Sequence, residues 1–116
     1  VSETADPGFP DEITYLNSRL VPLVQTIIAE SEVPPIIILQ SDHGLDNEVR
    51  LANFIAIHFP GAGESLLYPT LTPVNIFRLL FNAYFGQDFP LLPDASYQSA
   101  YGDYYNFTEV TYPCTP

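Results

Sequence analysis

A short run of branched aliphatic residues, Ile36 to Leu39, follows two prolines and stops at a group of polar residues. A continuous apolar run of this length predicts a strand that is buried on both faces. When helices cover both faces of a sheet, polar groups at the carboxyl end of such a strand lie beside the crevice where ligands bind. In this chain those groups are Asp42 and His43.

Asp42 and His43 are of two residue types that bind divalent cations, through a carboxylate oxygen and an imidazole nitrogen. Gly44 follows them and allows the backbone to bend sharply, so both side chains can reach one ion. A simple strand-to-loop turn explains the same residues without a metal, with Asp42 accepting backbone amides and His43 solvated. Two ligands do not make a metal site, so these residues alone leave both interpretations open.

A helix is predicted over residues 11–29. Asp11 and Glu12 lie in its first turn, where carboxylates interact favourably with the helix dipole. Apolar residues then recur at steps of three and four and form one face. Pro22 lies inside this pattern, and because an interior proline removes a backbone donor, we predict a kink in one helix rather than two helices. Residues 1–10 contain several helix-breaking residues and are predicted to be a linker or arm.

Two strands are predicted at residues 36–40 and 53–59. Neither run alternates between apolar and polar residues, which favours a parallel pair buried by helices. His58 lies at the end of the second run and is a further candidate metal ligand. A single histidine in an apolar strand is more typical of a hydrogen-bonded core residue than of a ligand.

A second helix is predicted over residues 73–85, because Thr72 followed by a proline favours a helix start and Gly86 favours a C-terminal cap. It is apolar nearly all round, so we expect it to be buried against the sheet. Arg78 inside it then needs a carboxylate partner or a route to solvent. With the first helix and the strands, it completes a predicted α/β core over residues 11–94.

Residues 95–116 form a tail rich in tyrosine and are predicted to contain an irregular hairpin around Gly102 and Asp103. Its aromatic side chains either pack back onto the domain or form a contact surface for another chain. Asn106 begins a glycosylation sequon. Cys114 is the only cysteine, so a disulfide within the chain is excluded.

The chain is strongly acidic, with 14 Asp and Glu residues, three Lys and Arg residues, and a net charge of −11 at pH 7. Such a surface repels nucleic acid and anionic membranes, which disfavours both as partners. No apolar run reaches the roughly 18 residues that a membrane span requires. A chain of 116 residues with 47% hydrophobic residues forms one domain at most, with a modest core.

Several segments, taken in order, carry a resemblance to known proteins: Tyr15-Leu16-Asn17, Pro34 to Gly44, Leu67 to Arg78, Tyr84-Phe85-Gly86, Pro90 to Asp94 and the Tyr-rich end. Together they resemble the late part of the catalytic domain in the alkaline phosphatase superfamily. The most similar branch is that of the sulfatase and lipoteichoic-acid-synthase-like hydrolases, in which a Ser-Asp-His-Gly segment supplies two metal ligands. The resemblance runs from about Tyr15 to Thr111.

The resemblance implies a fold, a cofactor and an activity. The fold is part of an alkaline-phosphatase-like α/β sandwich, with two helices packed on a small sheet and an irregular tail. Asp42 and His43 would hold a divalent metal (Mn, Zn, Mg or Ca) in a hydrolase of phosphate or sulfate esters. The nucleophile and further metal-binding carboxylates of such enzymes lie upstream of this segment. We therefore expect the chain alone to be inactive, and its partner to be the remainder of an extracytoplasmic or secreted hydrolase.

A competing hypothesis is a non-enzymatic structural protein, extracellular and self-assembling, that reuses this fold. The absent nucleophile and the Tyr-rich tail favour it. In that case the partners are other copies of the chain, joined head to tail in filaments or by two-fold symmetry in dimers.

Overall fold

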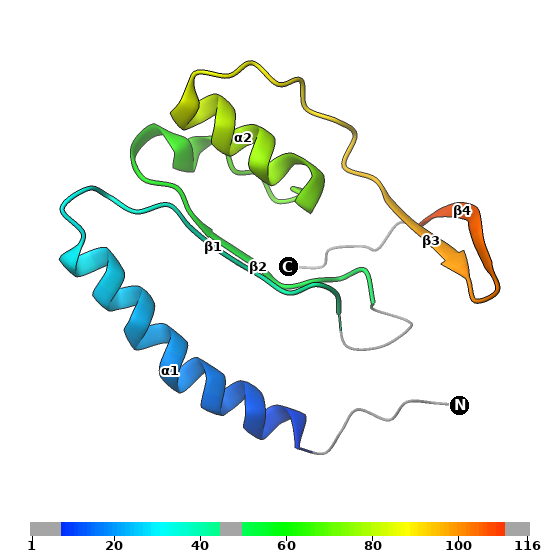
Figure 1. Ribbon diagram of the computed structural model, residues 1–116, viewed down its shortest axis with the longest axis horizontal. Coiled ribbons are helices and arrows are strands. Elements are labelled where there is room, and N and C mark those ends of the chain that lie inside the picture. Colours follow the sequence, from blue (N-terminus) through cyan, green and yellow to red (C-terminus); the bar gives the residue numbers. More distant parts are fainter. Residues whose placement is uncertain (1–7, 45–49, 111–116) are drawn as a thin grey trace. The chain divides into compact units, whose positions relative to one another are not determined.

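The computed structural model describes residues 8–44 and 50–110 (Figure 1). Three helices and two small antiparallel sheets make up these residues, so the fold is mixed α/β. The chain divides into two compact units, residues 1–58 and 59–116, which we describe separately. Most of the predicted N-terminal arm, the loop at residues 45–49 and Cys114 lie outside the described residues.

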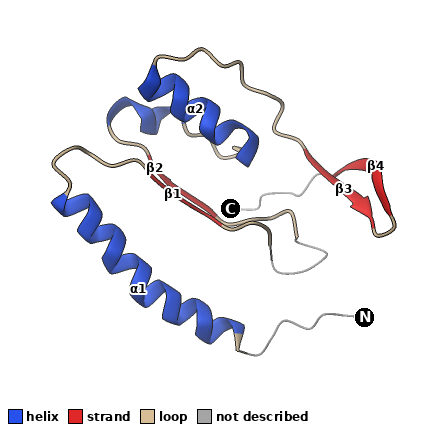
Figure 2. Cartoon of the chain, viewed as in Figure 1, coloured by secondary structure: helices blue, strands red, loops and turns tan. Residues whose placement is uncertain are grey.

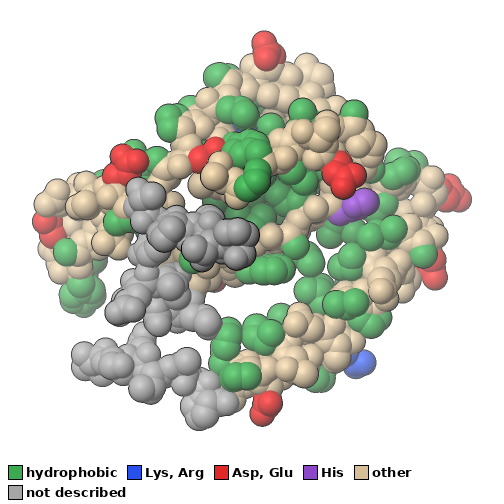
Figure 3. Space-filling view, turned by 180° about the vertical axis from the view of Figure 1, so that it is seen from behind, with side chains coloured by type: hydrophobic (Ala, Val, Ile, Leu, Met, Phe, Trp, Pro, Cys, Tyr) green, Lys and Arg blue, Asp and Glu red, His purple; other side chains and the backbone are tan. Residues whose placement is uncertain are grey.

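The first unit begins with helix α1 (Phe9–Glu30), which extends the predicted helix by two residues at its start and one at its end. It is one unbroken helix through Pro22 (Figure 2). No residue of α1 is buried, and apolar side chains such as Leu16 and Leu23 are more than half exposed. Figure 3 shows hydrophobic side chains at the surface along this helix.

Strands β1 (Ile37–Gln40) and β2 (Ile55–His58) form the first sheet. They pair antiparallel, with Ile37 opposite His58 and Gln40 opposite Ile55, so the predicted parallel pairing is wrong. An aliphatic run indicates apolar character on both strand faces, but the connection between the strands sets their direction. The strands were predicted to be buried, but their apolar residues are only half-buried. None of the described residues before Phe59 is buried.

The second unit contains the buried core of the described residues. Helix η1 (Gly61–Leu66), a 3-10 helix, precedes α2 (Pro73–Phe85), which has the predicted bounds. The buried apolar residues are Phe59, Ile76, Leu79 and Leu80. Only one face of α2 is therefore buried, although its sequence is apolar nearly all round. Phe77 and Phe85 on other faces are more than half exposed.

Both ends of α2 follow from the sequence. Thr72 precedes the helix with an extended backbone, and its carbonyl accepts the Asn75 amide at 3.1 Å. Gly86 ends the helix at φ 63°, a left-handed conformation that glycine adopts without steric penalty.

Tyr84 joins α2 to η1. Its hydroxyl donates to the Pro60 carbonyl at 2.8 Å, and its ring meets the Phe59 ring edge to face with centroids 5.6 Å apart. Gly63 packs beneath the Tyr84 hydroxyl, where any side chain would overlap it.

The tail forms the predicted hairpin from β3 (Ser96–Ala100) and β4 (Asp103–Val110), which turns at Gly102 with φ 87°. An irregularity in the register lies between Ser99 and Ala100. Among the described aromatic side chains of the hairpin, those of Tyr101 and Tyr105 do not pack back onto the domain, since they are 98% and 94% exposed. In the described part of the chain, no helix combines the length and apolarity needed to cross a bilayer.

Candidate functional site

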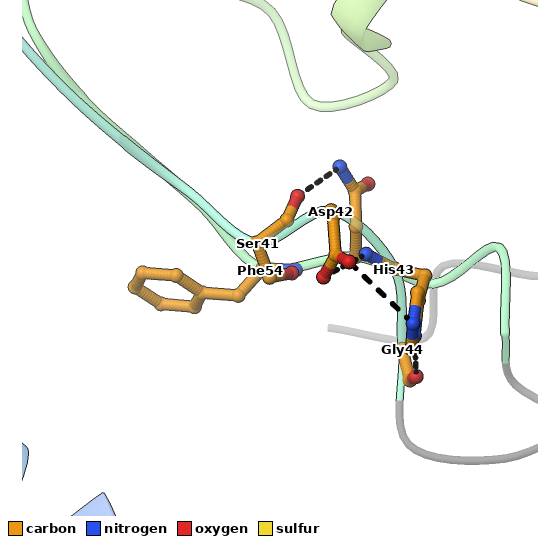
Figure 4. A network of polar contacts seen from close by, with 6 residues as sticks. Ser41, Asp42, His43, Gly44 and Phe54 are labelled. Carbon is orange, nitrogen blue, oxygen red and sulfur yellow. Dashed lines mark hydrogen bonds and ion pairs between the residues drawn. The ribbon is translucent and has the colours of Figure 1, made fainter.

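The backbone beyond β1 remains attached to the opposite strand (Figure 4). Ser41 donates its amide to the Phe54 carbonyl at 3.0 Å, and its Oγ accepts the Phe54 amide at 2.8 Å. Further along, the Gly44 amide donates to the Arg50 carbonyl at 2.6 Å. Asp42 and His43 therefore lie on a short projecting segment that is held at both ends.

The two side chains face one another across this segment. Asp42 Oδ1 accepts the backbone amide of His43 at 3.0 Å, which is the contact expected of a simple turn. The other carboxylate oxygen, Oδ2, lies 3.6 Å from His43 Nε2. Both side chains are open to solvent, with 88% of Asp42 and 41% of His43 exposed.

A second contact fixes the orientation of the imidazole. His43 Nδ1 lies 2.7 Å from the Gly44 carbonyl oxygen. Because a carbonyl oxygen only accepts, Nδ1 carries the proton in this contact. In the neutral ring the lone pair is then on Nε2, the nitrogen that faces Asp42. This arrangement is common in metal-binding histidines, whose other ring nitrogen donates to a carbonyl or carboxylate.

The spacing of the two donor atoms suits a shared cation. Nitrogen and oxygen ligands lie about 2.1 Å from zinc, so two ligands of a tetrahedral ion are roughly 3.4 Å apart. The observed 3.6 Å between Nε2 and Oδ2 is close to that value. A carboxylate and an imidazole fit zinc or manganese, and additional oxygen ligands would favour magnesium or calcium.

His58 does not join this pair. It lies opposite Ile37, whereas Asp42 lies five residues after Ile37, beyond the end of β1, a separation of about 16 Å at roughly 3.3 Å per residue. The antiparallel pairing places the two histidines at opposite ends of the hairpin. Within residues 8–44 and 50–110, no group of three His, Cys, Asp or Glu residues is positioned to hold a metal.

An apolar groove runs beside the pair, within the first unit. Ile13, Leu16 and Leu20 of α1 line one wall, and the other wall includes Ile38 to Gly44, which contains Asp42 and His43. The volume of the groove is about 1020 Å³. The exposed donor atoms are thus next to an apolar surface.

A polar cluster around Asp94 was not predicted from the sequence. Asp94 Oδ1 accepts the Thr72 amide at 2.8 Å and the Thr72 hydroxyl at 2.6 Å. Tyr68 donates to Oδ2 at 2.6 Å, and the Asn75 side chain donates to Oδ1 at 3.2 Å. Burial raises the pKa of the Asp94 carboxyl, but the hydrogen bonds from Thr72, Tyr68 and Asn75 outweigh it and hold the pKa below its ordinary value.

The same cluster affects the tyrosine. Burial and the hydrogen bond to Asp94 raise the pKa of the Tyr68 hydroxyl. Because protein donors already occupy both Asp94 oxygens, this cluster fits a structural role better than a ligand site.

Three polar residues of α2 hold the segment that follows the helix. Asn75 is fully buried and bonds to both the amide and the carbonyl of Leu92. Asn82 bonds in the same way to both backbone groups of Phe89, at 2.7 and 2.9 Å. Arg78 donates to the Pro90 carbonyl at 3.1 Å, so it is satisfied by a backbone oxygen rather than by a carboxylate. Asn75, Arg78 and Asn82 recur at steps of three and four residues, which is the spacing that places side chains on one face of a helix.

No protein-family model, no curated protein and no solved structure matches the chain.

Proposed function

We propose that this chain contributes two metal ligands, Asp42 and His43, to a metal-dependent hydrolase of phosphate or sulfate esters. The proposal assigns the chain to the C-terminal part of an alkaline-phosphatase-like α/β sandwich, in the sulfatase and lipoteichoic-acid-synthase-like branch. One observation carries it: the hydrogen bond from His43 Nδ1 to the Gly44 carbonyl, which leaves the Nε2 lone pair facing a carboxylate oxygen 3.6 Å away.

Asp42 and His43 would hold a divalent cation, which would supply a Lewis acid to polarise an ester oxygen and stabilise the charge that develops during transfer. Asp42 contributes an anionic oxygen and His43 a neutral nitrogen. The resemblance puts the nucleophile in a segment outside these residues. The isolated chain then binds metal but does not hydrolyse esters.

The partner in this proposal is the remainder of the hydrolase domain. Three features of the first unit support it: α1 buries no residue, the groove beside it is apolar, and the sheet has only two strands. A two-stranded sheet is marginally stable by itself, and an apolar surface of this kind marks a contact site. As the resemblance suggests, we place the protein outside the cytoplasm or in the secreted fraction.

Calorimetric titration with Zn²⁺ tests the ligand assignment. Asp42→Ala and His43→Ala should each weaken binding by at least about tenfold, since each removes one of the two protein donors. His58→Ala is the matched control, because it removes an exposed imidazole from the other end of the same hairpin. Equal losses in His43→Ala and His58→Ala would contradict the assignment.

An activity assay tests whether the isolated chain lacks the nucleophile. The isolated chain should release no product from 4-nitrophenyl phosphate or 4-nitrophenyl sulfate in the presence of Mn²⁺ or Zn²⁺. Hydrolysis that Asp42→Ala abolishes would show instead that the nucleophile lies within these 116 residues.

The exposed apolar side chains of α1 also favour a second candidate, a non-enzymatic protein that assembles with copies of itself. Sedimentation with and without a chelator separates the two candidates. Large oligomers that persist in chelator would support assembly. Asp42 and His43 would then be residues of a simple turn and not metal ligands. A monodisperse chain that binds one metal would support the hydrolase.

A further inference from the structure

Ser41 is attached to the opposite strand in an unusual way. Gln40 lies opposite Ile55, so continuation of the same register would pair Ser41 with Phe54. In a regular hydrogen-bonded pair of antiparallel strands, the two residues exchange both amide-to-carbonyl bonds. Here only one of the two forms, from the Ser41 amide to the Phe54 carbonyl.

The hydroxyl of Ser41 replaces its backbone carbonyl in the other bond. The Phe54 amide donates to Ser41 Oγ at 2.8 Å. The displaced Ser41 carbonyl accepts the side-chain amide of Asn53 at 3.3 Å instead. Both backbone groups of Ser41 are therefore satisfied, but its carbonyl no longer points at Phe54.

This exchange affects the next peptide unit. The Ser41 carbonyl belongs to the peptide that leads into Asp42, so turning it away from Phe54 rotates that peptide out of the ladder. Asp42 and His43 follow on the projecting segment, and the ladder closes again between Gly44 and Arg50. Figure 4 shows Ser41 beside the pair, in contact with the opposite strand.

We propose that Ser41 and Asn53 are positioning residues, which hold the peptide before Asp42 in the orientation that brings the Asp42 and His43 donors together. The inference rests on the proposed metal-binding role of that pair. It does not make Ser41 a ligand or a nucleophile. The Ser41 hydroxyl acts through the backbone, by occupying the Phe54 amide.

The inference predicts that loss of the hydroxyl reorders the segment without unfolding the hairpin. In Ser41→Ala the Phe54 amide can bond to the Ser41 carbonyl, which restores a regular pair and pulls the following peptide into the ladder. Ser41→Thr keeps the hydroxyl and should retain the native arrangement. Ser65→Ala is the matched control, since this hydroxyl bonds only to the local Ala62 carbonyl among the described contacts.

Two measurements on these variants test the proposal. The first is the ¹⁵N chemical shifts of the His43 imidazole in metal-free protein at alkaline pH, which report the tautomer. The second is Zn²⁺ affinity by calorimetry. Ser41→Ala should lose the preference for the Nδ1–H tautomer and bind Zn²⁺ about tenfold more weakly, the lower end of the range for residues that orient ligands. Asn53→Ala should change the His43 tautomer preference and the Zn²⁺ affinity in the same direction as Ser41→Ala. Ser41→Thr and Ser65→Ala should change neither quantity.

The outcomes separate this inference from the proposed function. Wild-type tautomer and affinity in Ser41→Ala would overturn the inference, as would failure of Ser41→Thr to preserve them. Failure of the wild-type chain to bind Zn²⁺ at His43 would overturn the proposed function, whereas the tautomer measurement would still test the positioning role. Cross-strand contacts between Leu39 and Ala56, which are register partners, check that the hairpin remains folded in each variant.

Discussion

Asp94 shows how one carboxylate can fix the course of a segment. Its two oxygens accept bonds from Thr72, Tyr68 and Asn75, so the chain two residues before β3 is held at the N-terminal end of α2. A carboxylate at this end of a helix also interacts favourably with the helix dipole.

Asp94→Asn should destabilise the second unit at neutral pH. The folded pKa of Asp94 lies below its unfolded value, so its stabilisation is present above the unfolded pKa and is lost as the pH falls through the folded pKa. Because the side chain is exposed to solvent, we expect a loss of only about 1 kcal/mol at pH 7. Urea denaturation should show this difference vanishing in acid.

Asp88→Asn is the matched control for that substitution. It makes the same change of charge in the segment between α2 and β3, away from the polar cluster. A loss of stability equal to that of Asp94→Asn would mean that net charge, rather than the cluster, causes the effect.

Gly63→Ala should destabilise the contact between η1 and α2. The added Cβ would overlap the Tyr84 hydroxyl and lie 2.7 Å from the adjacent ring carbon and 3.1 Å from Phe59 Cβ. Overpacking of this kind costs about 1–3 kcal/mol. Thermal unfolding measures it, with Ser65→Ala in the same helix as the control. An unchanged melting temperature in Gly63→Ala would show that Tyr84 moves aside freely.

At the scale of single elements, the sequence predicted helices better than strand arrangement. Thr72, Pro73 and Gly86 are local signals, and they were enough to give the bounds of α2. The direction of β2 relative to β1 depends on the path of the connection between them, which no local pattern encodes. The apolar runs predicted that both strands exist, but not how they pair.

The candidate site, too, could be predicted from the sequence only in part. Asp42, His43 and Gly44 are adjacent in sequence, so their proximity could be predicted. The roles of Ser41 and Asn53 could not, because they depend on which residues lie opposite each other across the hairpin. The polar face of α2 was not predicted, although Asn75, Arg78 and Asn82 recur at steps of three and four residues, and its backbone partners depend on the tertiary fold.

The two long helices should respond differently to truncation of an apolar side chain. Ile76 of α2 is fully buried, so Ile76→Ala should cost about 2–5 kcal/mol. Leu16 of α1 is 52% exposed, so Leu16→Ala should change stability by no more than about 0.5 kcal/mol in the isolated chain. Chemical denaturation of both variants is the test. A large loss in Leu16→Ala would mean that α1 is buried in solution, by another copy or by the second unit.

At the scale of the whole molecule, stability is distributed unevenly. Every buried residue among those described lies at or after Phe59, and the described residues of the first unit are all exposed or half-buried. The described part of the unit that carries the candidate ligands therefore has no buried core. This is the distribution expected if the first unit is completed by another part of a larger domain.

Amide hydrogen exchange should be slower in the buried core of the second unit than in the hairpin of the first. Amides of Ile76, Leu79 and Leu80 should exchange slowly, because the α2 core must open to expose them. Amides of β1 and β2 should exchange faster, since the hairpin buries nothing fully. Equal protection of the hairpin and α2 would show that the two units unfold together.

The central claim is that Asp42 and His43 share one divalent cation, and Mn²⁺ line broadening tests it most directly. A chain of charge −11 attracts cations everywhere, so the location of the broadening matters more than its presence. We predict that the first trace of Mn²⁺ broadens the Asp42 and His43 resonances and leaves those of His58 sharp. Broadening that spreads evenly over the acidic residues, or that reaches His58 as early as His43, would contradict the claim.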